Sequence, residues 1–412
     1  MPSRSDITYF GAGPALLPTD VLEEAAAALL NYNDTGLGVA EHSHRSQIAA
    51  TIINEAKADL VSYLDIPDDY EILFMQGGGS GQFASMAYNF VGNWVTRKQK
   101  EVQGSESDES AVPKLKSAVE NLKIDYIITG GWSQKAAAEA ERLFGPEHVN
   151  IVADGRKEND GKFGTIPSED TWKLSRDHAM VFLCDNETVH GVEFPGFPKC
   201  LEPGPDGPIV VADMSSNILS RKIPVSKYAA IFFGAQKNLG STGITVVIIQ
   251  KRFLQQPSAA LMRQLSLPVP PRILEFETIA KNNSLYNTLS IFDIFIAGRV
   301  LKRLLQQHPD KVQGQQVLSD KKAQLIYEAL EAYPDIYQII PDKTVRSRMN
   351  ICFRIKGGDA VEETFLKDAA ALGLTGLKGH RELKGIRASN YNSISLEGAE
   401  KLAKFIRDFA SR

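Results

Sequence analysis

The stretch AAIFFGAQKNLGSTGITVVIIQ, residues 229–250, places a lysine between two apolar segments. AAIFF and ITVVIIQ each have the length and the branched or aromatic composition of a buried strand. Strands that are apolar on both faces are typical of a sheet covered by helices. Lys237 follows the first segment directly, in a turn rich in glycine. It is either a solvated turn residue or an amine held in an active site.

Strand and helix patterns alternate through the first two thirds of the chain. Apolar segments such as YEILFMQ (70–76) and VFLCDNET (181–188) run into polar or glycine-rich turns, and amphipathic helical patterns lie between them. This alternation favours an α/β fold with a mostly parallel central sheet. We therefore predict a large domain over residues 17–300.

The pattern changes after Tyr286, where two long amphipathic helices are followed by a strand and further helices. It predicts a smaller C-terminal α+β domain over residues 301–412, joined by an N-terminal segment, residues 1–16. Residues 97–123 are polar, with an acidic and serine-rich middle. We predict that they form an inserted surface loop with no core of its own.

Composition and charge exclude several classes of function. The chain has 412 residues and a net charge of -4, which gives no general attraction to nucleic acid or anionic membranes. Small molecules or other protein chains are the expected partners. The three cysteines have neither disulfide-framework nor metal-ligand spacing, and no apolar run reaches membrane-spanning length. We expect a cytoplasmic protein with no metal site.

The segment QGGGSGQFASMAYNF (76–90) combines a strand end, a run of glycines and a helical pattern. Backbone amides at such a helix start bind anions, so a phosphate fits here. No Walker lysine follows, and Gly79-x-Gly81-x-x-Ala84 matches the dinucleotide pattern only loosely. A flexible turn is the alternative.

Asp213 and Lys237 complete a set of chemically matched residues. Asp213 ends the apolar strand IVVAD (209–213), and Lys237 follows the next strand. Ligands bind at this edge of open α/β sheets. A phosphate-binding loop, a strand-end aspartate and a strand-end lysine together suit pyridoxal 5'-phosphate. Taken singly, Asp213 as a turn cap and Lys237 as a surface residue remain the alternatives.

Two further strand ends carry polar or aromatic side chains. Trp132 follows a strand and two glycines, so its ring either stacks on a planar cofactor or packs in the core. Asn186, Thr188 and His190 follow another strand, and the Thr188 hydroxyl either donates to a ligand or belongs to a turn.

Two basic clusters lie far apart in the sequence. HSHRS contains His44 and Arg45, and KGHRELKGIRASNYN contains His380, Arg381 and Arg387. No carboxylate or cysteine pattern completes a metal site around the histidines. Arginine beside histidine suits oxyanions, so the clusters indicate a substrate with more than one negative group. A solvated basic face is the alternative for each.

At these motifs the sequence resembles the phosphoserine aminotransferase family, in the class V branch of the fold type I pyridoxal phosphate enzymes. The resemblance covers nearly the whole chain and is strongest in ADMSSNILSR, GAQKNLG, NNSLYNT and KGHRELKGIRASNYN. It implies reversible amino transfer between O-phospho-L-serine and 2-oxoglutarate, giving 3-phosphohydroxypyruvate and L-glutamate, in L-serine biosynthesis. It also implies a homodimer whose active site is shared between subunits.

The resemblance assigns roles residue by residue. Around the cofactor it implies Lys237 as the Schiff-base lysine, Asp213 at the pyridine nitrogen, Gly79, Ser80 and Gln236 at the phosphate, Trp132 on the ring and Thr188 at its hydroxyl side. Asn287 and Thr288 would reach the partner's cofactor phosphate. For the substrate it implies His44, Arg45, His380 and Arg381 at the anionic groups and Arg387 at the α-carboxylate. Many bacterial members have arginine where this chain has Ser80, which leaves the backbone amide in place.

Three alternatives remain at this point. Another class V aminotransferase, of the serine–glyoxylate type, would not need His380 and Arg381. A cysteine desulfurase needs a reactive cysteine on a mobile loop, whereas Cys352 lies within a strand pattern. A non-catalytic nucleotide-binding protein would rest on the glycine loop alone and leaves Lys237 unexplained.

Overall fold

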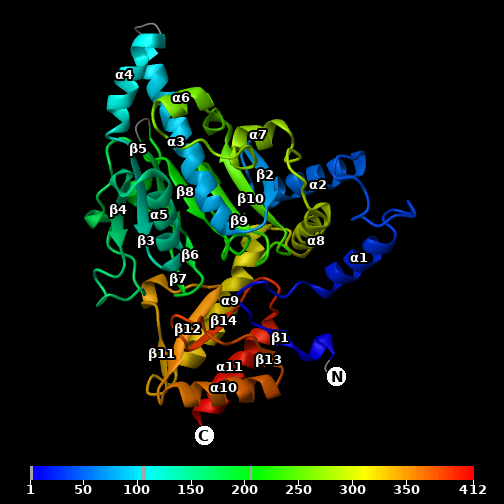
Figure 1. Cartoon of the computed structure of the whole chain (residues 1–412). Helices are drawn as coiled ribbons and strands as arrows, with labels where there is room; N and C mark the ends of the chain where they lie inside the picture. The colour runs from blue at the N-terminus through cyan, green and yellow to red at the C-terminus, as the bar shows by residue number, and fades with distance from the viewer. Residues whose placement is uncertain (1–2, 104–107, 205–206) are drawn as a thin grey trace.

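The computed structural model describes residues 3–103, 108–204 and 207–412, which form a larger and a smaller part (Figure 1). The larger part contains eight of the described α-helices: α1 Thr19–Leu30, α2 Gln47–Leu64, α3 Gly79–Gln103, α4 Asp108–Val119, α5 Gly131–Phe144, α6 Ala259–Gln264, α7 Phe276–Lys281 and α8 Ile291–Gln307. Its strands are β2 Tyr70–Gln76, β3 Lys123–Ile128, β4 Val149–Asp154, β5 His178–Cys184, β6 Asn186–Glu187, β7 Val192–Glu193, β8 Val210–Asp213, β9 Ala230–Gly234 and β10 Ile244–Gln250. None of the helices in these ranges is long and apolar enough to span a membrane.

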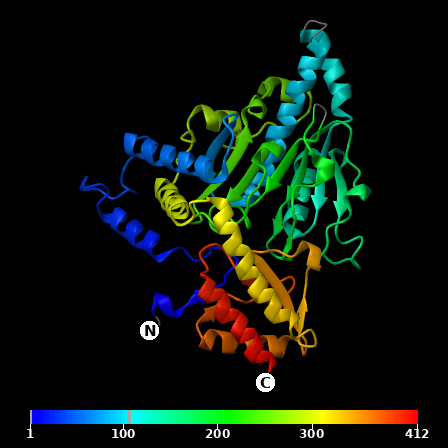
Figure 2. The same cartoon turned by 180° about the vertical axis from the view of Figure 1, so that it is seen from behind.

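A seven-stranded sheet forms the centre of the larger part, in the order β2-β10-β9-β8-β5-β3-β4. Strand β10 is antiparallel to both of its neighbours, and the remaining pairings are parallel. Helices lie on both faces of this sheet (Figures 1 and 2). The predicted α/β class with a mostly parallel sheet is confirmed.

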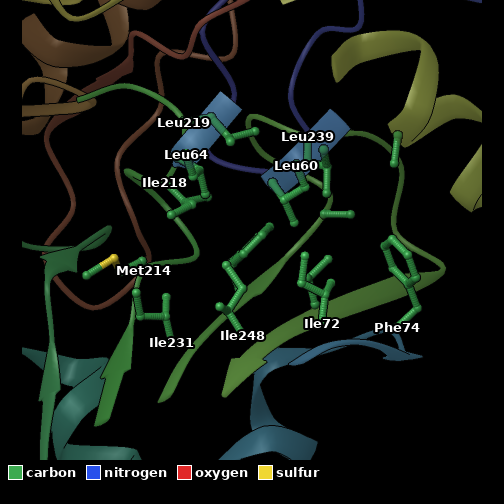
Figure 3. Packing of buried hydrophobic residues seen from close by; sticks show 14 of the residues in the cluster. Leu60, Leu64, Ile72, Phe74, Met214, Ile218, Leu219, Ile231, Leu239 and Ile248 are labelled. Carbon is green, nitrogen blue, oxygen red and sulfur yellow. The ribbon is translucent and has the colours of Figure 1, made fainter. Parts of the chain in front are cut away.

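Two apolar layers cover the sheet, one on each face. On one face, Leu60 and Leu64 of α2 pack with Ile72 of β2 and Ile248 of β10 (Figure 3). On the other face, α3 and α5 contribute the layer. Burying each large aliphatic side chain stabilises the fold by about 1.5–3 kcal/mol. Both strand faces are therefore apolar, as the continuous apolar segments of the sequence predict.

The smaller part is built on a three-stranded antiparallel sheet covered by helices. Its elements are α9 Val312–Glu331, α10 Asp359–Ala371, α11 Leu396–Ala410, β11 Tyr337–Ile339, β12 Asn350–Ile355 and β14 Ile386–Ser389. The N-terminal segment joins this part through β1 Thr8–Tyr9, which pairs in parallel with β13 Leu374–Thr375. Helix α8 runs through residues 300 and 301 without interruption, so the predicted domain boundary lies inside a helix of the larger part.

The prediction of an inserted surface loop over residues 97–123 is wrong in its secondary structure. Helix α3 continues to Gln103, α4 follows, and β3 begins at Lys123; residues 104–107 lie outside the described part. Leu115 and Leu122 are buried in the same apolar layer as α3. Leu115, Val119 and Leu122 have helical i, i+4, i+7 spacing, a sequence signal that the polar composition obscured.

Candidate functional site

A cavity of about 410 Å³ opens at the carboxyl-terminal edge of the central sheet. The ends of β8 and β9 and the turns after β2, β3 and β5 all meet there. Nine of the predicted residues line it: Gly79, Ser80, Trp132, Thr188, Asp213, Gln236, Lys237, His380 and Arg387. The structure thus brings together side chains from both parts of the molecule.

Lys237 lies in the turn after β9 and is only 9% exposed. Its Nζ donates a hydrogen bond to Thr188 Oγ1 at 2.8 Å. Burial lowers the pKa of Lys237, and the neighbouring Asp213 carboxyl opposes that shift. The lysine is therefore held inside the cavity and is not a solvated turn residue.

Asp213 ends β8 and is buried beside Lys237. Its Oδ1 accepts a hydrogen bond from Ser215 N at 2.8 Å, and Ser215 Oγ accepts one from Gly234 N at 3.1 Å. Burial raises the pKa of Asp213, while hydrogen bonds from Ser215 and the charge of Lys237 act in the opposite direction. A cationic group in the cavity would favour the carboxylate form.

The glycine run turns the chain sharply from β2 into α3. A Cβ on Gly77 would lie 2.1 Å from Thr242 O, and Gly78 has a φ of +115°, so both positions favour glycine. Gly78 N donates to Thr245 Oγ1 at 2.9 Å. Helix α3 begins at Gly79, which places its first amides at the cavity. Such a helix start suits an anion.

Glu187 is a buried residue of this region to which sequence reasoning assigned no role. It is completely buried in β6 and accepts hydrogen bonds from Trp132 N and Ser133 N, both at 2.9 Å, and from Ser133 Oγ at 2.6 Å. It therefore caps the start of α5 and fixes the backbone that carries Trp132. Its position just after β5, beside Thr188, indicates that it lies near the cavity, but no local sequence signal shows its contact with α5.

Arg387 and His380 reach the cavity from the smaller part. Arg387 Nη1 donates to the Thr188 carbonyl oxygen at 3.3 Å, which links the two parts at the site. Burial lowers the pKa of His380. Tyr391 Oη donates to Ala12 O at 2.9 Å, and Ala12 and Gly13 also line the cavity. No site role was assigned to these two residues, although FGAGPALLP was among the family-like motifs.

Five predicted residues do not line this cavity within the described chain: His44, Arg45, Asn287, Thr288 and Arg381. His44 and Arg45 lie just before α2, whose N-cap Ser46 accepts from Ala49 N at 3.2 Å. Asn287 instead lines a smaller cavity of about 110 Å³ beside the glycine run. Gln76 Nε2 donates to the Thr288 carbonyl oxygen.

A family model described as Aminotransferase class-V matches residues 7–127 and 120–402. The chain belongs to this family. It is 42% identical to the phosphoserine aminotransferase of Saccharomyces cerevisiae, over 99% of this chain and 98% of that protein. It is also 41% identical to the phosphoserine aminotransferase of Drosophila melanogaster, over 98% of both chains. The resemblance inferred from the motifs is confirmed.

Solved structures agree with these relatives. The phosphoserine aminotransferase from Bacillus circulans subsp. alkalophilus superposes with a TM-score of 0.82 at 34% identity, covering 98% of both chains. The PLP-bound phosphoserine aminotransferase from Trichomonas vaginalis gives a TM-score of 0.81 at 33% identity, covering 97% of this chain and 99% of that one. The fold and the family are thus supported by both sequence and structure.

Proposed function

We propose that the chain catalyses reversible, pyridoxal phosphate-dependent amino transfer between O-phospho-L-serine and 2-oxoglutarate. The products are 3-phosphohydroxypyruvate and L-glutamate, and in the reverse direction the reaction supplies a precursor of L-serine. The observation that carries this proposal is the buried Lys237, which shares one cavity with Asp213 and Arg387. The full-length identity to phosphoserine aminotransferases supports the choice of substrate.

The cavity fits pyridoxal phosphate. Two polar atoms there, Trp132 Nε1 and Gln236 Oε1, are buried without a hydrogen-bond partner in the described chain, and the start of α3 offers amides to a phosphate. The residues that would hold the cofactor are Lys237 at its aldehyde, Asp213 at its ring nitrogen, Trp132 and Thr188 beside its ring, and Gly79, Ser80 and Gln236 at its phosphate. When bound, pyridoxal phosphate supplies a carbonyl that takes up and returns the amino group and a ring that delocalises negative charge.

Lys237 acts as the nucleophile and as the proton acceptor of the proposed reaction. Because burial lowers its pKa, the amine loses its proton more readily than an exposed lysine does. An unprotonated Nζ attacks a carbonyl and accepts the proton from the substrate α-carbon. The Thr188 hydroxyl, 2.8 Å away, orients this amine toward the cavity.

The Asp213 carboxylate would keep the cofactor's ring nitrogen protonated. Its carboxyl is buried and is fixed by the Ser215 amide, so it needs no reorganisation during the reaction. A carboxylate in this position favours the cationic form of a ring nitrogen beside it. By this charge, Asp213 would favour loss of the substrate α-proton, because a cationic ring would stabilise the negative charge that develops.

Arg387 would bind the α-carboxylate through its guanidinium fork, and His380 would bind the second anion of the substrate. Phosphoserine and glutamate each carry an α-carboxylate and one further anionic group, so one set of cations serves both. Arg381, His44 and Arg45 would complete this set.

A homodimer is the second part of the proposal. Asn287 and Thr288 lie outside the cavity of their own chain, in a region where Tyr286 is 38% exposed and Ile273 44% exposed. Leu30, at 82% exposed, lies at the end of α1. Contiguous exposed apolar surface favours contact with another chain, and Ile273 lines the same small cavity as Asn287. We place Asn287 and Thr288 at the partner's cofactor phosphate.

Subunit mixing tests the sharing of the site. Lys237→Ala homodimers and Asn287→Ala/Thr288→Ala homodimers should each have little activity. After dissociation and random reassociation, about half the dimers would be hybrids with one intact site, so about a quarter of wild-type activity should return. If no activity returns although hybrids form, the shared-site proposal is wrong.

A cytoplasmic location is also proposed. The three cysteines are unpaired, as in proteins of reducing compartments. The same cysteines argue against a desulfurase, because burial raises the pKa of the Cys184 thiol well above its usual range, that of Cys352 to about 12 and that of the more exposed Cys200 to about 11. None of the three is therefore a ready thiolate.

An absorption spectrum tests the main proposal. Protein loaded with pyridoxal phosphate should show a visible band that O-phospho-L-serine converts to the amino form of the cofactor. Lys237→Ala should abolish this conversion, whereas the exposed Lys222→Ala should retain it. A band that responds to serine or alanine but not to phosphoserine would instead favour the serine–glyoxylate type of aminotransferase.

A further inference from the structure

We propose a second anion-binding site, in a cavity at the amino-terminal edge of the central sheet, which takes a phosphate group. The cavity has a volume of about 440 Å³ and lies between the last turns of α3, the start of β5 and the segment after β10. This proposal does not depend on the aminotransferase activity.

The cavity is remote from the candidate active site. Strand β5 runs from His178, which lines this cavity, to Cys184, which lines the active-site cavity. At about 3.3 Å per residue, the two ends of this strand are roughly 20 Å apart. A ligand in the second cavity would therefore not touch the groups that hold the cofactor.

The lining of this cavity has an excess of positive charge. Its cations are Arg97, Lys100, Arg176 and Arg252, and none of the four forms a salt bridge with another residue in the described ranges. The cavity also contains Glu101 and Asp177, but Lys98 Nζ pairs with both, at 2.9 and 2.7 Å. Lys100 Nζ donates to Gln255 Oε1 at 2.9 Å and Arg252 Nε donates to Gln250 Oε1 at 2.7 Å, so their described partners are neutral. In a chain of net charge -4, four cations that line one cavity without a salt bridge in the described ranges are a local exception.

Arg97 gives the strongest indication of a ligand. Its Nη2 donates to the His178 carbonyl oxygen at 3.3 Å, but its Nε is buried and has no partner among the described residues. Burial lowers the pKa of Arg97, and the nearby charge of Arg252 adds to that effect, although Asp177 and Glu101 oppose it. An anion between the Arg97 and Arg252 guanidinium groups would offset their repulsion.

Phosphate is the anion that this set of donors favours. Three arginines present planar donor groups that match phosphate oxygens in pairs, and Lys100 adds a point charge. The volume exceeds that of inorganic phosphate, so an organic phosphate with a small polar body also fits. Inorganic and organic phosphates share the recognised group, and the test separates them.

The test measures binding of radiolabelled inorganic phosphate to the cofactor-loaded enzyme by equilibrium dialysis, with chloride keeping the ionic strength constant. Phosphate that binds at the candidate active site is recognised with the variant Arg387→Gln, which removes a cation there and leaves the second cavity intact. Binding that persists in this variant is assigned to the second cavity. Arg176 and Arg252 are exposed and form no salt bridge within the described chain, so the double variant Arg176→Gln/Arg252→Gln should fold normally. The exposed Arg263→Gln on α6 is the matched control.

We expect the double variant to bind phosphate at the Arg387-independent site at least about tenfold more weakly than wild type does, because charged hydrogen bonds are lost. Arg263→Gln should be unchanged. Equal phosphate binding in wild type and the double variant would overturn the proposal. If glycerol 3-phosphate displaces the labelled phosphate from this site, the ligand class is organic phosphates; if it does not, the site is restricted to inorganic phosphate.

Discussion

Replacing Lys322 by methionine should remove a pH dependence from the stability of the folded chain. Lys322 is completely buried in α9. Its Nζ donates to the carbonyl oxygens of Asn390 at 3.4 Å, Tyr391 at 2.8 Å and Ile394 at 2.8 Å. Burial lowers the pKa of this lysine to about 7. The lysine thus secures the segment after β14, whose Tyr391 donates a hydrogen bond to Ala12 O at the lining of the candidate site.

The sign of the effect follows from the two pKa values. An unfolded lysine has a pKa near 10.5, so between about pH 7 and 10.5 the unfolded chain binds a proton that the folded chain has released. The free energy of unfolding therefore rises with pH in this range. For a folded pKa of about 7, the contribution of Lys322 between pH 7.5 and 9.5 is about 2.5 kcal/mol.

Urea unfolding at pH 7.5 and 9.5 measures this contribution. The change in unfolding free energy between the two pH values should be about 2.5 kcal/mol more positive in wild type than in Lys322→Met. The neighbouring Lys321 is exposed, so Lys321→Met should behave like wild type. Parallel pH dependences in wild type and Lys322→Met would refute the reasoning. They would mean that the three carbonyl oxygens hold the ammonium form and offset the effect of burial.

Three further substitutions test the site and the fold. Arg387→Gln should raise KM for phosphoserine and for glutamate roughly a hundredfold, because each substrate loses a bidentate charged contact to its α-carboxylate. Steady-state kinetics with both substrates measures this change. An effect on one substrate only would contradict the shared role. Glu187→Ala leaves two amides and one hydroxyl at the start of α5 without their acceptor, so it should lower the unfolding free energy by about 2–4 kcal/mol. It should also shift the fluorescence emission of Trp132, which is obtained by subtracting the spectrum of the same protein with Trp132→Phe. An unchanged Trp132 spectrum would show that other contacts hold this backbone. Leu115→Ala should cost about 2–4 kcal/mol in urea unfolding, because Leu115 is buried, whereas a solvated loop would lose almost nothing.

Strand ends made much of the candidate site predictable from the sequence. In a parallel sheet the carboxyl ends of the strands meet at one edge, so polar residues directly after apolar segments converge whatever their separation along the chain. Asp213, Thr188 and Lys237 were identified in this way, and all three line one cavity. The rule needs only the strand positions, which the apolar segments gave clearly.

Residues that act through another element were not predictable in this way. The role of Glu187 depends on the distance between β6 and the start of α5, and no local pattern encodes that distance. The helix α4 was missed for a different reason. Its average composition is polar, whereas Leu115 and Val119 are buried, as is Leu122 just beyond the end of the helix. Composition describes the solvated faces of such a helix, whereas periodicity describes the face that packs.

The lysine between two strands has a topological explanation as well as a chemical one. Strand β9 ends at Gly234 and β10 begins at Ile244, and the two are neighbours in the sheet. A parallel crossover needs a dozen or more residues, usually including a helix, and residues 235–243 are too few. Strand β10 must therefore run antiparallel, as observed, and the connection stays at the carboxyl edge. Of the residues in that short turn, Gln236 and Lys237 line the cavity with Asp213, which ends the adjacent strand β8, so the antiparallel strand of this sheet keeps Lys237 at the site.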